Sequence, residues 1–410
     1  MSDERHDAAS PPVGHVVDQF LKRSTTFIYT LLRFQRAFRP VVLAETTANL
    51  DEFPFGAVRV LRPRDAGLAR RGTRRLAARV AGYSTTVARL IADEAERAGC
   101  ELLHAHFGLM GYRSLAAAQR LDLPLVTTFY GHDLALPDRD EAWRRRYQRL
   151  FAGGDLFVCE GPTMATTLAR IGCPEEKIRI VRIGLDVEGV AFSPRTPAGK
   201  LTVIQTARLI PKKGVDLSLR AFAAARAELG EAELLIVGDG EERERLEALA
   251  AELGLGDTVR FLGSLSYAEY QQAMAGADIG LQPSRVAPDG DTEGGAPTVL
   301  IEMQAAGLAV LGSRHADLPF VVAHHDGLVE EEDVAGLADG LVRVARLDPE
   351  RLRKRADEAR AFVEREHDAR RTGAQIEEVY REALGQPPGR AARTGTPGDR
   401  ALAVQGQAHA

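Results

Sequence analysis

The chain has 410 residues, more than one ordinary hydrophobic core holds, so we expect two domains. Hydrophobic residues make up 45% and charged residues 27%, as in a typical globular protein, and no apolar run approaches the roughly 18 residues of a membrane span. This excludes a protein held by transmembrane helices. The amino terminus, MSDERHDAASPPVG, is polar and lacks a signal-peptide pattern, so we expect a cytoplasmic protein.

Short apolar runs alternate with helical patterns through the first half of the chain. Strands are predicted at residues 40–47, 101–108, 123–131, 155–161 and 177–184. A helix is predicted within residues 76–98, where apolar residues recur at helical spacing. Strands nearly continuous in Val, Ile and Leu, with helices between them, predict a parallel sheet covered on both faces.

The second half repeats this alternation. Strands are predicted at residues 201–209, 232–240, 258–264, 277–284 and 308–313, and helices at 214–230, 241–254, 266–275 and 297–306. Two successive sets of such units predict an α/β protein of two Rossmann-like, doubly wound domains that face a central cleft. The Pro/Gly-rich segment 189–200 is the predicted junction.

The composition also suggests the boundaries of the parts. We expect a disordered amino terminus, two domains, a helix that returns to the first domain, and a disordered tail rich in Pro, Gly and Ala. The corresponding ranges are 1–12, 13–195, 196–366, 367–385 and 386–410.

The segment DGDTEGGAPTVLIEMQAAGLAVLGS (289–313) carries the strongest chemical signal. Gly294 and Gly295 leave the backbone open, and Pro297 suits the first residue of the following helix. A glycine turn that leads into a helix N-terminus is a potential phosphate site. Glu302, about one turn into that helix, could accept hydrogen bonds from a ribose diol. The alternative is an acidic surface loop before an amphipathic helix.

A second signal lies in ARLIPKKGVD (207–216), where a strand leads into a helix. Arg208 and Lys213 lie five residues apart across a tight turn, so both can reach one point. A guanidinium fork and an ammonium charge together suit a diphosphate. The alternative is a solvated basic turn, which is the reading we give Lys212. Together the two signals predict a nucleotide-diphosphate site without a metal ion.

The stretch TTFYGHDL (127–134) places a polar cluster at the end of a predicted strand. Tyr130, His132 and Asp133 are candidates to line the cleft. In the strand before it, His104 and His106 share one face. His106 is the better cleft candidate because it is nearer the carboxyl end of the strand. His104 is expected to be a buried core residue.

Several segments resemble a known family. ARLIPKKG, LLIVGDGEERERLEALAAELGLGDTVRFLGSL and EGGAPTVLIEMQAAGLAVLGS are similar to the donor-binding domain of retaining GT-B glycosyltransferases (glycosyltransferase family four, group 1). FLKRSTTFI and LHAHFG resemble the branch that makes exopolysaccharides of the colanic-acid type. The resemblance implies a GT-B fold, a UDP- or GDP-sugar donor, no metal or other cofactor, retention of anomeric configuration, and an acceptor bound mainly by the first domain.

The resemblance also implies roles for single residues. Arg208 and Lys213 would hold the donor pyrophosphate and stabilise charge on the leaving nucleotide. Glu302 would bind the ribose. Glu293 and the amides of Gly294 and Gly295 would face the transferred sugar. The main chain of Arg260 and Leu262 would lie against the base. Thr26 of the first loop would lie in the cleft.

Two departures from the family pattern stand out. Eight residues, not the usual seven, separate Glu293 from Glu302. The family's FHG is FYG here, which puts Tyr130 in place of the usual active-site histidine. Transfer of this kind needs no base from the protein, because the leaving phosphate can accept the proton. We therefore expect His132 to line the cleft as a contact, not to act as a base.

Residues 59–89 hold nine arginines and one acidic residue, Asp65. A solvated helix face is one reading. The functional reading is a surface that binds anionic lipid at the inner face of the cytoplasmic membrane, or that binds a lipid-diphosphate acceptor. Nucleic acid is disfavoured because the run lacks aromatic residues between Leu61 and Gly82.

These features predict a retaining hexosyltransferase that moves a sugar from a nucleotide-diphosphate sugar to a lipid-linked or glycan acceptor in surface polysaccharide or glycolipid assembly. Two alternatives stay open: a nucleotide-sugar-binding protein of the same fold without transferase activity, and a nucleotide-sugar epimerase.

Overall fold

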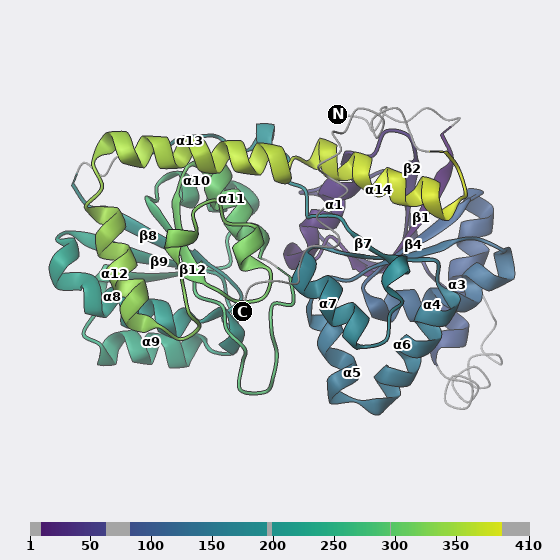
Figure 1. The fold of residues 1–410 in the computed structure, drawn as a ribbon, viewed down its shortest axis with the longest axis horizontal. Coiled ribbons are helices and arrows are strands. Elements are labelled where there is room, and N and C mark those ends of the chain that lie inside the picture. Colours follow the sequence, from purple (N-terminus) through teal and green to yellow (C-terminus); the bar gives the residue numbers. More distant parts are fainter. Residues whose placement is uncertain (1–9, 63–82, 195–198, 296, 388–410) are drawn as a thin grey trace.

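The computed structural model describes residues 10–62, 83–194, 199–295 and 297–387. The described chain forms two parallel sheets with helices on both faces (Figure 1). The first sheet has seven strands in the order β3-β2-β1-β4-β5-β6-β7, and the second has six in the order β10-β9-β8-β11-β12-β13. All strand pairs in both sheets are parallel. The predicted pair of doubly wound domains is thereby confirmed.

The strands of the first sheet are β1 (Pro12–Phe20), β2 (Arg39–Thr47), β3 (Val58–Val60), β4 (Leu102–His106), β5 (Leu125–Thr128), β6 (Leu156–Cys159) and β7 (Ile178–Ile180). Those of the second are β8 (Leu201–Thr206), β9 (Ala232–Val237), β10 (Val259–Gly263), β11 (Ile279–Gln282), β12 (Ala309–Ser313) and β13 (Leu328–Val329). Each predicted strand is present. Three others, β1, β3 and β13, are additional to the sequence prediction. β1 lies near the centre of its sheet, but Gly14, His15 and Asp18 interrupt its apolar pattern.

The helices associated with the first sheet are α1 (Thr26–Arg33), α3 (Tyr83–Ala98), α4 (Gly108–Leu121), α5 (Leu136–Arg139), α6 (Glu141–Gly153) and α7 (Pro162–Arg170). Those that follow are α8 (Val215–Leu229), α9 (Arg243–Glu252), α10 (Tyr267–Ala275), α11 (Thr298–Ala306), α12 (Val334–Ala345), α13 (Pro349–Glu366) and α14 (Ala369–Ala383). The sequence suggested Pro297 as the first residue of α11, and this prediction is wrong. The ψ of 128° at Pro297 is extended, so this residue caps the helix and Thr298 begins it.

Side-chain alternation along the strands places hydrophobic clusters on both faces of the first sheet. Leu103 and Ala105 of β4 pack in the cluster that contains residues of α3, α4 and α6. Leu102, on the opposite face of β4, packs with Ile376 and Tyr380 of α14. The period of two therefore also places His104 and His106 on the face that α14 covers.

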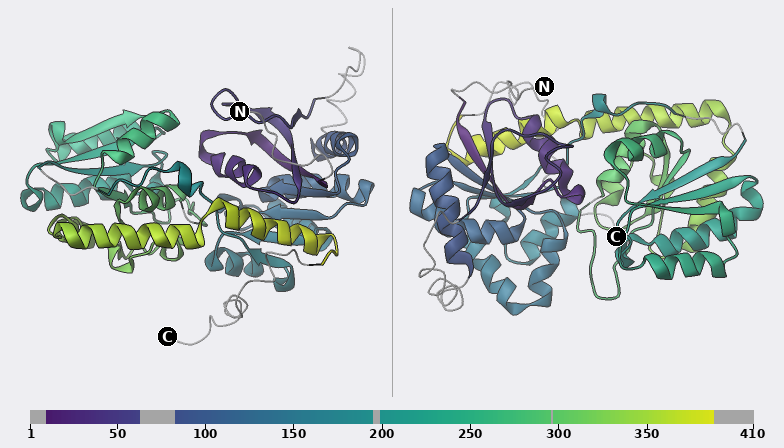
Figure 2. Two further views of the ribbon diagram at one scale, coloured as in Figure 1. Left: turned by 90° about the horizontal axis from the view of Figure 1, so that it is seen from above. Right: turned by 180° about the vertical axis from the view of Figure 1, so that it is seen from behind.

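The carboxyl-terminal helices run along both domains (Figures 1 and 2). α13 packs on α11 of the second domain, and α14 packs on α1 of the first. The helical pattern is continuous in the sequence, but it breaks at His367, whose φ of −130° and ψ of 10° lie outside the helical region. The Asp368 side chain caps α14 by accepting a hydrogen bond from the backbone N–H of Arg370. Among the helices of the described ranges, none combines the length and apolar character needed to cross a membrane.

Candidate active site

The carboxyl-terminal edges of the two sheets meet at a backbone contact between two loops. Gly131 follows β5 and has a φ of 111°; a Cβ there would lie 1.9 Å from the carbonyl oxygen of Glu293. Gly294, with a φ of 74°, approaches Gly131 so closely that its own Cβ would lie 2.2 Å from the Gly131 Cα. Only glycine combines these dihedral angles with this approach. The two glycines thus bring the loops after β5 and β11 together.

A second contact joins the loops after β6 and β12. Asp317 is 1% exposed, and its carboxylate accepts hydrogen bonds from the backbone N–H of Thr163 at 2.9 Å and of Met164 at 3.3 Å. These groups belong to the first turn of α7. Burial raises the pKa of Asp317, and the hydrogen bonds from Thr163 and Met164 oppose that rise. A residue of the second domain therefore caps a helix of the first. The sequence analysis missed this residue.

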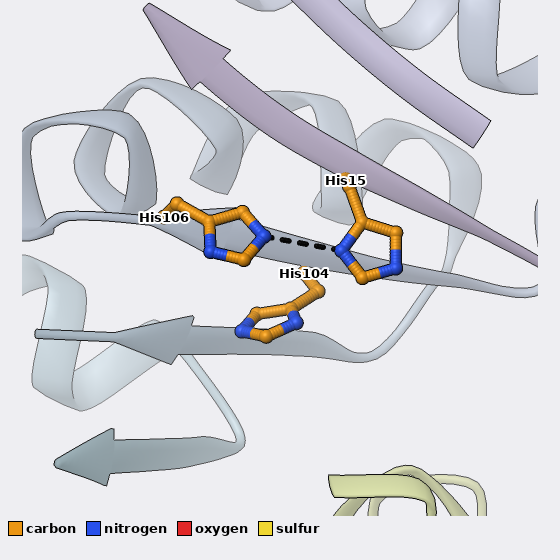
Figure 3. Close-up of side chains that lie close together, drawn as sticks. All are labelled: His15, His104 and His106. Carbon is orange, nitrogen blue, oxygen red and sulfur yellow. Dashed lines mark hydrogen bonds between the residues drawn. The ribbon is translucent and has the colours of Figure 1, made fainter. Parts of the chain in front are cut away.

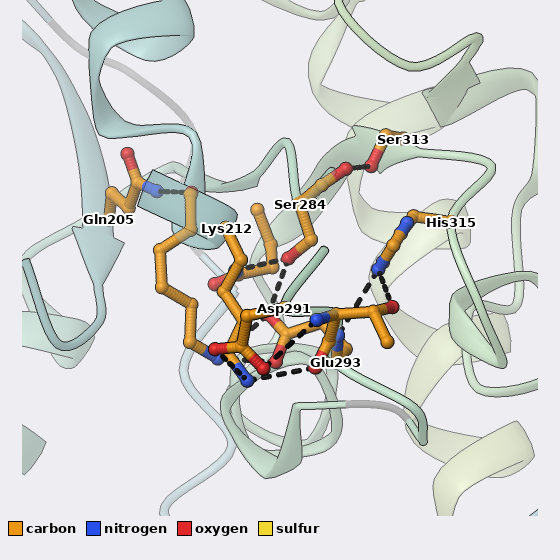
Figure 4. A network of polar contacts seen from close by, with 10 residues as sticks. Gln205, Lys212, Ser284, Asp291, Glu293, Ser313 and His315 are labelled. Carbon is orange, nitrogen blue, oxygen red and sulfur yellow. Dashed lines mark hydrogen bonds and ion pairs between the residues drawn. The ribbon is translucent and has the colours of Figure 1, made fainter. Parts of the chain in front are cut away.

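Lys213 and Glu293 form the central ion pair of the site. The Lys213 Nζ lies 2.7 and 2.8 Å from the two carboxylate oxygens of Glu293. The Ser284 hydroxyl donates to the same carboxylate at 2.7 Å (Figure 4). Burial alone would raise the pKa of Glu293, but the two neighbouring lysines and these hydrogen bonds lower it, so Glu293 is ionised at neutral pH.

Lys212 is a correction to the sequence analysis, which assigned it to a solvated turn. It is 3% exposed; its Nζ donates to the Thr292 carbonyl at 2.8 Å and pairs with Asp291 at 3.2 Å. Its place in a short 3₁₀ helix, Pro211–Lys213, turns it toward the acidic loop that also holds Glu293. Two successive lysines thus anchor this loop.

Arg208 remains exposed at the same edge, and its guanidinium forms no hydrogen bond or ion pair with any described residue. It nevertheless acts on Lys213: burial lowers the pKa of Lys213, Glu293 opposes this, and Lys212 and Arg208 lower it further. Lys212 and Arg208 therefore both lie within electrostatic reach of Lys213. A dianion such as a diphosphate would be stabilised at this point.

His315 supports the acidic loop from behind and was also missed by the sequence analysis. It is 2% exposed, and its Nε2 accepts a hydrogen bond from the backbone N–H of Glu293 at 3.2 Å. Its Nε2 also lies 2.8 Å from the hydroxyl of Thr292 (Figure 4). Because Nε2 accepts, Nδ1 carries the proton of the neutral ring and donates to Glu331 at 2.7 Å. Glu331 thereby orients the histidine that holds Glu293.

Glu302 lies on α11, half-buried, and accepts a hydrogen bond from the Tyr270 hydroxyl at 2.6 Å. Burial raises the pKa of Glu302 to about 6, although that hydrogen bond lowers it. The other residues expected near the nucleotide, Arg260 and Leu262, lie on the edge strand β10. Arg260 is exposed, with its Nη1 4.0 Å from a Glu233 oxygen, and Leu262 packs against a core cluster that includes Tyr270.

The loop after β5 separates its polar residues. His132 is exposed and its ring lies 5.9 Å from that of Phe107. Asp133 is 1% exposed; its carboxylate accepts from the backbone N–H groups of Gly108 at 2.9 Å and Tyr130 at 3.2 Å. Asp133 therefore shapes the loop and the start of α4, and its carboxylate is buried.

Tyr130 is half-buried, and its hydroxyl lies 2.7 Å from the Nδ1 of His106. His106 itself is fully buried, so it reaches the cleft only through Tyr130. Thr26 begins α1 and is half-buried. The preceding turn contacts the second domain, since Arg23 donates to the Leu265 carbonyl at 3.4 Å.

Of the arginine-rich segment 59–89, residues 63–82 lie outside the described residues. Arg59 pairs with Glu94 at 3.5 Å and Arg89 with Asp93 at 3.8 Å. Arg62 is exposed.

Known sequence families match both halves of the chain. Residues 24–188 match the profile described as "Glycosyltransferase Family 4", and residues 188–361 match "Glycosyl transferases group 1". The two matches meet at residue 188, between the two sheets.

Individual proteins agree with these profiles. The chain is 34% identical over 274 residues to WcaL of Escherichia coli K12, whose name describes a colanic acid biosynthesis glycosyltransferase, covering 64% of this chain and 66% of WcaL. It is 31% identical to the amylovoran biosynthesis glycosyltransferase AmsK of Erwinia amylovora, covering 62% of this chain and 64% of AmsK. The matched region thus spans just under two thirds of these relatives.

Among solved structures, Anabaena HepE in complex with UDP-glucose superposes with a TM-score of 0.72 at 20% identity, covering 90% of this chain and 99% of that one. This likeness shows that the two share a fold. Together with the profiles and the relatives above, it leads to one conclusion: the chain belongs to the group 1 glycosyltransferases, with a family 4 domain as its first half.

Proposed function

We propose that this protein transfers a sugar from a nucleotide-diphosphate sugar to an acceptor hydroxyl. One observation carries the proposal: the exposed Arg208 lies within electrostatic reach of the buried pair of Lys213 and Glu293, where the two domains meet. This arrangement places two cations next to a carboxylate. The cations, Arg208 and Lys213, suit a diphosphate, and the Glu293 carboxylate lies beside the backbone of Gly294.

The proposed reaction breaks the bond between the anomeric carbon and the diphosphate oxygen and forms a bond to the acceptor oxygen. The electron pair of the broken bond stays on the leaving diphosphate, where Arg208 and Lys213 stabilise the negative charge. The acceptor's proton passes to that diphosphate oxygen. Departure and attack on one face of the sugar retain the anomeric configuration.

The remaining candidates fill positions around this centre. Glu302, ionised above its pKa of about 6, binds the ribose diol, and the main chain of Arg260 and Leu262 faces the base. Glu293 with the amides of Gly294 and Gly295 faces the transferred sugar. Tyr130 and His132 line the sugar and acceptor side, near Thr26 of the first loop.

The relatives support a substrate class. HepE was solved with UDP-glucose, and WcaL and AmsK are named for polysaccharide biosynthesis. We propose a UDP- or GDP-sugar as donor and a lipid-linked or glycan acceptor. The arginine-rich segment 59–89 would hold the protein at the inner face of the cytoplasmic membrane, where such an acceptor is presented.

The test begins with a thermal-shift panel of nucleotide sugars, because a ligand at a hundred times its dissociation constant adds about 2.7 kcal/mol of stability. Each stabilising sugar is then incubated with lipid-linked glycan, and free nucleotide diphosphate and the linkage formed are measured. Transfer supports the proposal. Binding without release of nucleotide diphosphate would indicate a nucleotide-sugar-binding protein without transferase activity. A changed sugar on an intact nucleotide would indicate an epimerase.

A further inference from the structure

Three histidines lie together under the cleft, between the first sheet and α14. His15 of β1 and His104 and His106 of β4 are all fully buried (Figure 3). The Nδ1 of His15 lies 3.1 Å from the Nε2 of His106. Burial lowers the pKa of each ring, that of His15 to about 3, so all three are neutral near pH 7.

The rings are arranged as a hydrogen-bonded chain and not as ligands of one metal ion. The ring centroids of His104 and His106 lie 4.4 Å apart, and the two rings are tilted by 34°. Both nitrogens of His104 are already bonded at 2.7 Å, to the hydroxyls of Tyr380 and Thr128.

The amide of Gln35 sets the direction of the first branch of this chain. Its Nε2 donates to the Nε2 of His15 at 3.5 Å, so that nitrogen is an acceptor. A neutral imidazole has one donor and one acceptor, so His15 donates from Nδ1 to the Nε2 of His106. By the same rule His106 carries its proton on Nδ1 and donates to the Tyr130 oxygen at 2.7 Å.

The second branch starts at the same amide. Gln35 donates to the Tyr380 oxygen at 3.3 Å, so the Tyr380 hydroxyl proton is directed to the Nδ1 of His104. His104 then donates from Nε2 to the hydroxyl oxygen of Thr128. Thr128 borders the same cavity as Tyr130. The first branch therefore ends on the Tyr130 oxygen as an acceptor, and the second ends on the Thr128 hydroxyl beside it.

We propose that Gln35 is a positioning residue that, through the buried histidines, makes the Tyr130 hydroxyl a hydrogen-bond donor to an oxygen atom of the bound sugar. The Tyr130 oxygen accepts the hydrogen bond from His106, so its own proton is not directed back to that histidine and is left for a ligand. A cavity of about 30 Å³ borders Thr128 and Tyr130 together with Glu160, and it has room for one such oxygen. The sugar itself rests on the proposed function; the proton order does not.

The first experiment reads the proton order directly, from ¹⁵N shifts of histidine-labelled protein. The expected result is Nδ1–H for His15 and His106 and Nε2–H for His104. In Gln35→Glu a carboxylate can only accept, so His15 and His106 should both change to Nε2–H. An Nε2–H tautomer of His106 in the wild type, or a stoichiometric metal ion in the purified protein by elemental analysis, overturns the inference.

The second experiment is a double-mutant cycle on transfer from the donor identified above. Tyr130→Phe and Gln35→Glu are each expected to lower kcat/KM about tenfold, as for one lost hydrogen bond. In the Tyr130→Phe background, Gln35→Glu should cause no further loss. Multiplicative losses would show that Gln35 acts on the fold in general, and would refute the positioning role. If the wild type transfers no sugar, only the proposed function is refuted, because the ¹⁵N experiment still tests the proton order.

Discussion

Gly131→Ala is expected to lower sugar transfer about a hundredfold while both domains stay folded. The new Cβ would lie 1.9 Å from the carbonyl oxygen of Glu293, whereas ordinary contact begins near 3.4 Å. The two loops must therefore separate by about 1.5 Å. A displacement of about 1 Å in a reacting group can cost a hundredfold in rate. The same movement would pull Glu293 away from the point where we place the sugar.

The stability cost should be modest by comparison. Gly131 has a φ of 111° and a ψ of −77°, a conformation that costs a residue with a Cβ about 1–3 kcal/mol. Gly172 is the matched control because its φ is 102° and nothing lies within 4 Å of the position of its Cβ. Gly172→Ala places a Cβ at a similar positive φ without the contact between domains.

The assay compares kcat/KM for transfer and the thermal unfolding midpoint of both variants. Similar midpoints, with transfer reduced only in Gly131→Ala, would support the contact as part of the working enzyme. If Gly131→Ala transfers sugar as fast as Gly172→Ala, the close approach of the two loops is not required, and the reasoning fails.

Further predictions concern the proposed donor site and the basic segment. Lys213→Ala and Glu302→Ala should each reduce kcat/KM about a hundredfold or more, with the exposed Lys200→Ala as control; near-wild-type rates in both would contradict the donor-site assignment. Because burial raises the pKa of Glu302 from 4.5 to about 6, folding takes up a proton between these values, and the carboxylate destabilises the folded state above pH 6. At pH 8 the free energy of unfolding of Glu302→Gln should therefore exceed that of wild type by about 2 kcal/mol, and its unfolding temperature should be higher. At pH 4.5 the two should unfold at the same temperature, and an equal difference at both pH values would refute the raised pKa. Changing four arginines to serine should weaken binding to anionic liposomes, and unchanged binding would rule out the membrane role; the four are Arg70, Arg71, Arg74 and Arg75.

The sequence by itself determined the two parallel α/β domains, because the alternation of strand-sized apolar runs with helices is a local pattern. It also identified the basic turn at Arg208 and Lys213 and the glycine turn at Gly294, since both depend on spacing within a few residues. Resemblance to the family added roles for these residues.

Tertiary structure decided which side chains are free. Lys212 and Lys213 are adjacent and chemically identical, yet only a fold that brings residues 291–293 beside them shows that both are buried and paired. Asp133 is polar in the sequence, but two backbone N–H groups occupy its carboxylate.

The histidine chain is the clearest case of a feature that only the tertiary structure could reveal. Its members come from β1, from β4, from Gln35 before β2 and from Tyr380 of α14, and two directly hydrogen-bonded members, Gln35 and Tyr380, are 345 residues apart along the chain. Sheet order and the return of α14 across the first domain bring them together. No local pattern carries that information, because hydrogen-bond partners between distant segments depend on packing and not on spacing.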